Sequence, residues 1–285
     1  MPEPGRHILR QLFRSRFAAA GAVVLGAIVL AAIAAPLLSP FDPEHIDIRN
    51  RLAAPSWLGG PPGHPLGTDA VGRDLLSRIL FGARVSLFVG VATVLVGGTI
   101  GALLGVVAGY WRGWIETVIM RLVDIQLAFP SILLAVAIMA ILGPSLWNVI
   151  FVLSLATWAP FCRVARAQTL AVCEEDYITA SRAIGAGPWH IIWRHVVPNV
   201  LSPIIVIASF ALATSIINEA SLSFLGVGVP PTTPTWGGML GEGRNYLRIA
   251  WWVSTLPGIA LMLVVYSVNM LGDWLRDYLD PTLTD

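Results

Sequence analysis

Side chains able to carry out covalent chemistry are few in this 285-residue chain, and their spacing does not favour it. All 18 residues counted as Lys or Arg are arginines. A phosphate-binding loop needs the lysine of its Gly-Lys-Ser/Thr sequence to reach the nucleotide phosphates. Any ATP and Mg²⁺ chemistry that this protein depends on must therefore take place on another polypeptide. The sequence also lacks the HExxH and GxSxG patterns, so we expect a non-catalytic chain without a cofactor of its own.

The side chains that could bind a metal or form a disulfide are scattered. The five histidines lie mostly in loop regions, at His7, His45, His64, His190 and His195. His190 and His195 share a segment, but a spacing of five places them on different faces of a helix, so we expect no metal site. Cys162 and Cys173 form no CxxC pair, and we expect two free thiols on the cytoplasmic side.

Acidic residues within the apolar stretches are rare. Asp124 follows Arg121 by three residues, so the two can pair on one helix face. Glu219 falls near the outer end of an apolar stretch. Carriers driven by protons or sodium usually place acids near the bilayer midplane on several helices, and this pattern is missing. A stand-alone channel or secondary carrier is the main alternative reading, followed by an intramembrane enzyme.

The overall composition is that of a membrane protein. Only 12% of the residues are charged, compared with about 25% in an average soluble domain, and the mean hydropathy is +0.74. The net charge of +1 and the lack of a basic tract beyond the N-terminus give no indication of a nucleic-acid partner. We therefore predict an all-α polytopic protein whose surroundings are the lipid bilayer.

Six uncharged windows are long enough to cross a membrane, which requires about 20 mostly apolar residues. They are Phe17 to Leu38, Val85 to Trp111, Ile125 to Leu142, Ser145 to Cys162, Val196 to Asn218 and Ile249 to Gly272. Only Gly143-Pro144 separates the third from the fourth, which predicts a tight helical hairpin. The first window is too long for a signal-peptide core and is expected to be a retained anchor.

Arginines next to the windows set the expected orientation. Four precede the first window, at Arg6, Arg10, Arg14 and Arg16. They favour a cytoplasmic N-terminus, and six crossings then give a cytoplasmic C-terminus. We expect residues 1–83 to hold the tail, the anchor and an extracytoplasmic segment, residues 84–273 to form the transmembrane core, and residues 274–285 to form a cytoplasmic tail. The outward segments 39–74 and 223–248 are expected to be docking surfaces rather than simple connections.

Glycines and prolines predict how the windows pack. Gly97, Gly101, Gly105 and Gly109 recur every four residues and so share one helix face. In lipid, such small residues allow a second helix to approach closely, although the pattern does not say whether that helix belongs to the same chain. Three prolines within the later windows each remove a backbone donor and favour a kink, which serves either static shape or gating; they are Pro130, Pro203 and Pro257.

A polar, glycine-interrupted segment occupies the longest cytoplasmic loop, residues 163–195. Three acids at 174–176 favour a helix N-terminus, and Tyr177, Ala180 and Ile184 then form one apolar stripe. Gly185 ends this helix, and Gly187-Pro188 begins another. Amphipathic helices that lie on lipid usually carry basic polar faces, whereas this helix opens with acids. A protein partner is therefore the better interpretation.

This segment resembles the cytoplasmic coupling loop of ABC importer permeases. The family pattern is Glu-Ala-Ala, three residues, Gly, nine residues and Ile-x-Leu-Pro. Here Ala180-Ser181, Gly185 and Pro198 match with the full spacing. The remaining positions depart from the pattern and hold Thr179, His195 and Val197. Three further stretches resemble the second permease subunit of dipeptide, oligopeptide and nickel importers: HPLGTDAVGRDLLSR (64–78), LSFLGVGVPP (222–231) and NMLGDWLRDYLDP (269–281).

The resemblance covers nearly the whole chain and implies a type I ABC importer permease fold in the inner membrane of a prokaryote. It implies a second, similar permease subunit, two ATPase subunits that bind ATP and Mg²⁺, and an extracytoplasmic substrate-binding protein. The coupling loop would lie in a groove of one ATPase and transmit its closure to the helices, which would alternate between inward- and outward-facing states. Peptides are the expected cargo; nickel chelates, glutathione and oligosaccharides remain alternatives.

Overall fold

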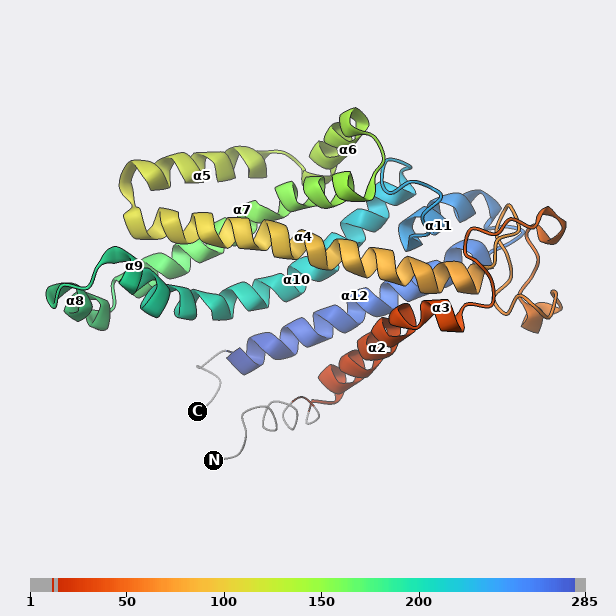
Figure 1. Ribbon diagram of the computed structural model, residues 1–285, viewed down its shortest axis with the longest axis horizontal. Helices are drawn as coiled ribbons and strands as arrows, with labels where there is room; N and C mark the ends of the chain where they lie inside the picture. The colour runs from red at the N-terminus through yellow and green to blue at the C-terminus, as the bar shows by residue number, and fades with distance from the viewer. Residues whose placement is uncertain (1–11, 13–14, 280–285) are drawn as a thin grey trace.

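The structure, a computed structural model, describes residue 12 and residues 15–279. Five helices of this part are long and apolar enough to cross a membrane. They are α2 (Arg16–Ile33), α4 (Leu75–Trp111), α7 (Leu146–Cys173), the continuous helix Pro188–Phe224 and α12 (Trp252–Leu279). A sixth span is formed by α5 (Gly113–Ala128) and α6 (Ser131–Leu142) if this pair, bent by 88°, counts as one. The all-α prediction is confirmed, and the count of six spans holds on that condition (Figure 1).

The short elements gather at the two ends of the helical bundle (Figure 1). At one end lie α8 (Asp176–Ala183) and α9 (Pro188–Ile191). A π-helical segment (Ile192–Val196) then leads from α9 into the long helix α10 (Val197–Phe224). At the other end lie the irregular segment after α3 (Ala35–Leu38) and helix α11 (Trp236–Gly243). That end also holds three 3₁₀ turns, at Ile48–Asn50, Ser56–Leu58 and Arg244–Tyr246.

The long helices extend beyond the predicted windows because hydropathy marks only their apolar parts. Helix α4 starts at Leu75, ten residues before the predicted Val85, because the Asp74 side chain accepts a hydrogen bond from the Ser77 amide and caps it. It therefore runs through the predicted domain boundary at residue 84, and that division stays a prediction. Helix α7 continues to Cys173, so the first part of the predicted loop 163–195 is helical. Gly143, with φ of 79°, makes the predicted tight turn between α6 and α7.

The predicted glycine face packs against α7 of the same chain, which answers the question left open by the sequence. All four glycines are buried. A Cβ atom added to Gly97 would lie 2.7 Å from the Ser154 carbonyl oxygen, and one added to Gly109 would lie 2.7 Å from Thr169 Cβ. Real Cβ atoms do not approach so closely, so only glycine permits this helix distance. The two helices thus form one closely packed unit along most of their length.

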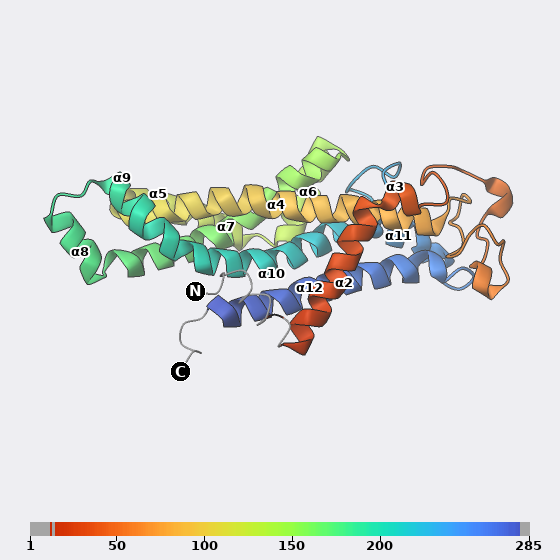
Figure 2. The same ribbon diagram turned by 60° about the horizontal axis from the view of Figure 1, so that its bottom comes forward.

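Helices α2, α4, α10 and α12 form a second packed unit around Trp236, Ile216 and Val268. Figure 2 shows α2 lying obliquely across α12, and Gly21 of α2 approaches Met270 of α12. The start of α2 and the end of α12 both point toward the α8 end, and their opposite ends point toward the segment 39–74 (Figures 1 and 2). Of the four N-terminal arginines that set the predicted orientation, Arg6, Arg10 and Arg14 lie outside the described residues.

One predicted ion pair is wrong. Asp124 does not pair with Arg121 on its own helix; it accepts a hydrogen bond from Arg163 of α7 at 2.9 Å. The reason is that α5 lies beside α7, which brings a longer-range arginine to the acid. A second contact of the same kind joins Arg166 of α7 to Glu116 of α5. These pairs connect α5 to α7 near the α8 end.

Candidate functional site

Helix α8 stands out from the bundle and is held by one buried side chain. Ile178 is fully buried in a cluster with Ile191, Val196 and Cys173. The predicted stripe lies on other sides of the helix: Tyr177 is 44% exposed and Ile184 is 87% exposed, and Ala180 is exposed too. The sequence analysis missed Ile178. An apolar stripe that stays exposed in the single chain is a surface suited to contact with another protein.

Gly185 occupies the left-handed position that ends α8, with φ of 86°. Its amide donates to the Arg182 carbonyl at 3.0 Å, and the Ala186 amide donates to the Ser181 carbonyl at 3.1 Å. These two bonds form a Schellman motif, in which glycine is favoured because it has no Cβ. Nothing lies within 4 Å of a Cβ added at Gly185. The requirement for glycine is therefore conformational and does not arise from crowding.

The connection from α9 to α10 is helical before the predicted window begins at Val196. The helix is already formed from Pro188 onward and runs through a π-helical segment into α10. The Val197 amide donates to the Ile192 carbonyl, one residue further back than in an α-helix. The segment precedes Pro198, which has no N–H and would crowd a regular α-helix. It lets the helix pass Pro198 without a break.

The π-helical segment also changes the placement of two histidines. The rings of His190 and His195 lie 6.1 Å apart, so the expectation that they face different sides is wrong. The wider helical turn brings residues five apart close together. Within the described residues, no group of three or more His, Cys, Asp or Glu side chains could hold a metal ion.

Two ion pairs at the α8 end are exposed. Arg112, just after α4, donates to Glu174, just before α8. The hydrogen bond from Arg112 lowers the pKa of Glu174. The side chains of Arg163 and Asp124 are 54% and 53% exposed. Exposed pairs of this kind contribute little to stability, so they orient the end of the molecule rather than hold it together.

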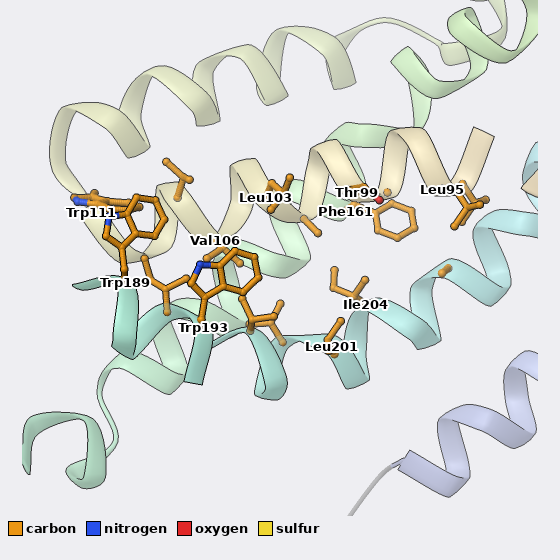
Figure 3. Close-up of a pocket in the computed structure, with 18 residues that line it drawn as sticks. Leu95, Thr99, Leu103, Val106, Trp111, Phe161, Trp189, Trp193, Leu201 and Ile204 are labelled. Carbon is orange, nitrogen blue, oxygen red and sulfur yellow. The ribbon is translucent and has the colours of Figure 1, made fainter. Parts of the chain in front are cut away.

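An apolar groove of about 320 Å³ lies between α4 and the helix that begins at Pro188 (Figure 3). Trp189 stands beside Trp111 with ring centroids 5.7 Å apart, and Trp193 lies next to them (Figure 3). The lining is apolar apart from the Thr99 hydroxyl and the indole N–H groups of its tryptophans, and it contains no charged side chain. It therefore offers no matching groups for a polar solute and suits contact with lipid or another apolar surface.

The opposite end of the molecule holds a buried ionic cluster. Arg78 is 2% exposed and donates to Asp69 and, at 2.8 Å, to Glu242 of α11. Arg73 donates to the same two acids at 2.6 and 2.8 Å. Burial raises the pKa of Asp69, but Arg78 and Arg73 lower it more, so its pKa lies below the ordinary value of 3.8. The cluster joins the segment 39–74 to α4 and α11.

Further hydrogen bonds, one of them involving a histidine, lie next to this ionic cluster. His64 Nδ1 lies 2.9 Å from Asp74, whose other oxygen accepts from the Ser77 amide at 2.8 Å. The indole of Trp252 donates to the Thr68 carbonyl at 3.3 Å. The motif at 64–78, given above only for its resemblance, is thus the part of the chain that folds the end opposite α8 around the start of α4.

Comparison with known proteins now identifies the family. Residues 101–285 match the model of the binding-protein-dependent transport system inner membrane component, and residues 3–55 match the N-terminal transmembrane domain of oligopeptide transport permease C. The chain belongs to this permease family. It is a non-catalytic subunit of an inner-membrane ABC importer, and it works with a binding protein and an ATPase. The predicted family, fold class and lack of catalysis are confirmed.

Relatives match this permease over almost its full length. It is 43% identical to the di/tripeptide transport system permease protein DppC of Pseudomonas aeruginosa, over 99% of this chain and 93% of that one. It is 42% identical to the glutathione transport system permease protein GsiD of Pectobacterium atrosepticum, over 98% of this chain and 92% of that one. A solved structure titled as an inward-facing conformation of the MetNI methionine ABC transporter aligns with a TM-score of 0.57 and 23% identity, over 72% of this chain and 96% of that chain. The last match supports the fold alone.

The structure separates the predicted site residues of the permease into two groups. Tyr177, Ala180, Ser181, Ile184 and Gly185 lie together on α8 and its end, whereas the glycine face lies inside the bundle. Pro198 is close to the first group, because Asn199 beside it donates to the Tyr177 hydroxyl at 3.4 Å.

Glu219 is the residue that the sequence analysis described least adequately. It lies near the C-terminal end of α10, and its surroundings were not predicted. It is fully buried and accepts hydrogen bonds from Ser86 of α4 at 3.0 Å and from Ser223 at 2.8 Å. The carboxylate thus connects α4 to α10 inside the bundle. Ser86 is separated from Glu219 by 133 residues, so no local pattern pointed to the pair.

Proposed function

We propose that this permease imports di- and oligopeptides as part of a complex with a second, similar permease, two ATPases and an extracytoplasmic binding protein. The observation that carries the proposal is its 43% identity, over 99% of the chain, to a protein named as a di/tripeptide permease. The buried ionic cluster supports an outer end with a fixed shape, as expected for a surface that receives a binding protein. ATP and Mg²⁺ act on the ATPase subunits.

The α8 end supplies the surface that we assign to the ATPase. Its stripe of Tyr177, Ala180 and Ile184 is exposed in the single chain, and the Schellman motif at Gly185 fixes its direction. Because the helix from Pro188 to Phe224 is continuous, a displacement of α8 reaches a membrane-spanning helix through a short connection. Closure of the ATPases would therefore move α10 and its neighbours between inward- and outward-facing states.

This assignment places α8, the N-terminus and the C-terminus in the cytoplasm. Figures 1 and 2 show the start of α2 and the end of α12 directed toward the α8 end and away from the segment 39–74, which supports it. A cysteine introduced at Trp57 should react with an impermeant reagent in intact cells, whereas one introduced at Thr282 should react only after the cells are permeabilised. The opposite labelling pattern would reverse the orientation.

The function is tested by reconstituting the full complex in liposomes with its own binding protein. We expect ATP-dependent uptake of radiolabelled di- and tripeptides, and no uptake without the binding protein or with an ATPase that cannot hydrolyse ATP. Glutathione is a necessary comparison substrate, because the chain is 42% identical to a permease named for it. Uptake of glutathione or a nickel chelate without uptake of peptides would contradict the proposed cargo.

A further inference from the structure

The break between α5 and α6 exposes irregular backbone partway across the bundle (Figure 1). The two helices meet at 88°, and the residues at the break are exposed, with Phe129 at 58% and Leu127 at 42%. Pro130 has no N–H, so the Gln126 carbonyl cannot receive its regular helical hydrogen bond. Among the described residues, no other donor bonds to the carbonyls of residues 125–128.

Unpaired backbone groups are costly in hydrocarbon. Irregular backbone at membrane depth is tolerated where it is buried in protein or lines a water-filled cavity. The exposure of the break shows that this chain alone does not bury it. The groups that lie beside the break therefore indicate whether a partner protein or water contacts its backbone.

A cavity of about 340 Å³ lies beside the break, between α6, α7 and α10. Pro160, inside α7, also lines it and deprives the Ala156 carbonyl, in the same lining, of its regular donor. The cavity carries hydroxyl and amide side chains but no charged one; these polar residues are Ser131, Thr157, Thr214, Ser215 and Asn218. It therefore differs from the apolar groove of Figure 3, whose side-chain polar groups are the Thr99 hydroxyl and the indole N–H groups of its tryptophans.

The polar groups of the cavity have capacity to bind a solute. Asn218 is only partly buried and its amide makes no hydrogen bond to another of the described residues. Thr214 donates its hydroxyl to the Phe210 carbonyl at 3.0 Å, and Thr157 donates to the Leu153 carbonyl at 2.7 Å, which leaves both oxygens free to accept. Free carbonyls, hydroxyl oxygens and one amide together match the alternating donors and acceptors of a peptide backbone.

We infer that this cavity is part of the path that peptides take across the membrane, and that it recognises the peptide backbone rather than the side chains. The inference rests on the proposed function. A neutral lining neither attracts nor repels a particular side-chain charge, whereas every peptide carries backbone amides. Weak, uncharged binding also lets the solute leave again, as passage requires.

The first test removes the polar groups and keeps the shape. The double variant Thr214→Val/Asn218→Leu, in the complete reconstituted complex, should lower peptide uptake on the order of tenfold. ATPase activity stimulated by the binding protein should stay at the wild-type level, which a misfolded complex would not show. The matched control is Thr99→Val in the apolar groove, which should transport at the wild-type rate. Wild-type uptake by the double variant would overturn the inference.

The second test measures contact with water. In a complex whose native thiols are removed by Cys162→Ala and Cys173→Ala, Asn218→Cys should react with a charged thiol reagent at least about tenfold faster than Thr99→Cys, because thiolates form readily only in a wet site. Transported peptide should slow the reaction. Equally slow reaction at both positions, with and without ATP, would show that a partner covers the break and would overturn the inference. If the wild-type complex transports no peptide while Asn218→Cys still reacts fast, the proposed peptide substrate is wrong. The cavity is then still a water-accessible part of the transport path.

Discussion

The two ends of the permease are built in opposite ways. At the end opposite α8, which we propose faces outward and call the outer end, Arg73 and Arg78 pair with Asp69 and Glu242. Their charges are thus neutralised within the chain. At the α8 end the pairs of Arg112 with Glu174 and of Arg163 with Asp124 are exposed. Large apolar side chains such as Ile184 and Trp189 also remain at the surface, 87% and 64% exposed. The charged groups of the outer end find their partners within the chain, whereas the apolar side chains of the α8 end remain exposed to a partner. The contrast indicates that the outer end keeps a fixed shape and that the α8 end is the part on which the ATPase is proposed to act.

The largest effect is expected from breaking the outer cluster. Arg78→Ala should lower the free energy of unfolding by about 3–5 kcal/mol, because it leaves buried carboxylates with less compensation. A fall in the melting temperature and in the yield of purified complex would measure this. Arg84→Ala is the control, since Arg84 is exposed on the same helix and its substitution should change stability by less than about 0.5 kcal/mol. Equal stability of both variants would show that the outer end is not held by this cluster.

At the α8 end, changing the backbone should affect coupling and leave assembly intact. Gly185→Val forces a branched side chain into the left-handed region, at a cost of about 1–3 kcal/mol, so α8 should lose its direction. In the reconstituted complex we expect ATP hydrolysis to continue while peptide uptake falls.

Gly187→Val provides a closely matched control for Gly185→Val. Gly187 also has nothing within 4 Å of an added Cβ, but its φ of −72° and ψ of 160° suit valine. It should transport at nearly the wild-type rate. If both variants transport normally, α8 is not the coupling element; if both fail equally, the added side-chain volume matters rather than the conformation.

Acid should weaken the outer end selectively. The pKa of Asp69 lies below 3.8 in the folded chain, so its carboxylate contributes stability above the unfolded value and loses it as the pH falls through the folded pKa. The melting-temperature difference between wild type and Asp69→Asn should be largest near neutral pH and shrink below about pH 4. The effect should be smaller than that of Arg78→Ala, since Glu242 still contacts both arginines. A difference that does not change with pH would contradict this role of Asp69.

The smallest effect is expected from an exposed pair on the other side of the molecule. Arg163→Gln removes the partner of Asp124, yet both side chains are about half exposed, and such pairs contribute about 0–1 kcal/mol. The melting temperature should change by no more than a few degrees, and the change should vanish at high salt. A loss as large as that of Arg78→Ala would mean that the α8 end is as tightly held as the outer end.

The sequence predicted what depends on local order. Hydropathy located the spans, the spacing of glycines located a close helix contact, and Gly185 was predicted as the end of a helix, where its φ of 86° confirms the conformation. The helix that covers the glycine face was not predictable, because Gly105 and Ala165 meet only after the hairpin of α6 and α7 has folded back.

Features that arise from long-range contacts were missed or wrong. Asp124 has an arginine three residues before it, but α7 brings Arg163 closer in space. The α5–α6 bend of 88° exceeds what Pro130 alone indicates. The π-helical segment before Pro198 depends on how the chain accommodates a proline within a continuous helix, and hydrophobic periodicity contains no information about that choice.

The outer cluster also sets an order of events during synthesis. Arg78 and Glu242 are separated by 164 residues, and Trp252 and Thr68 by 184. While the ribosome is still making α5 to α10, the outer segment has its local acid Asp69 but lacks its distant partners. Only after α11 has been synthesised can its Glu242 accept hydrogen bonds from both arginines. A chain truncated before Trp236 would therefore insert most of its spans but lack Glu242, and both arginines would be left without that partner.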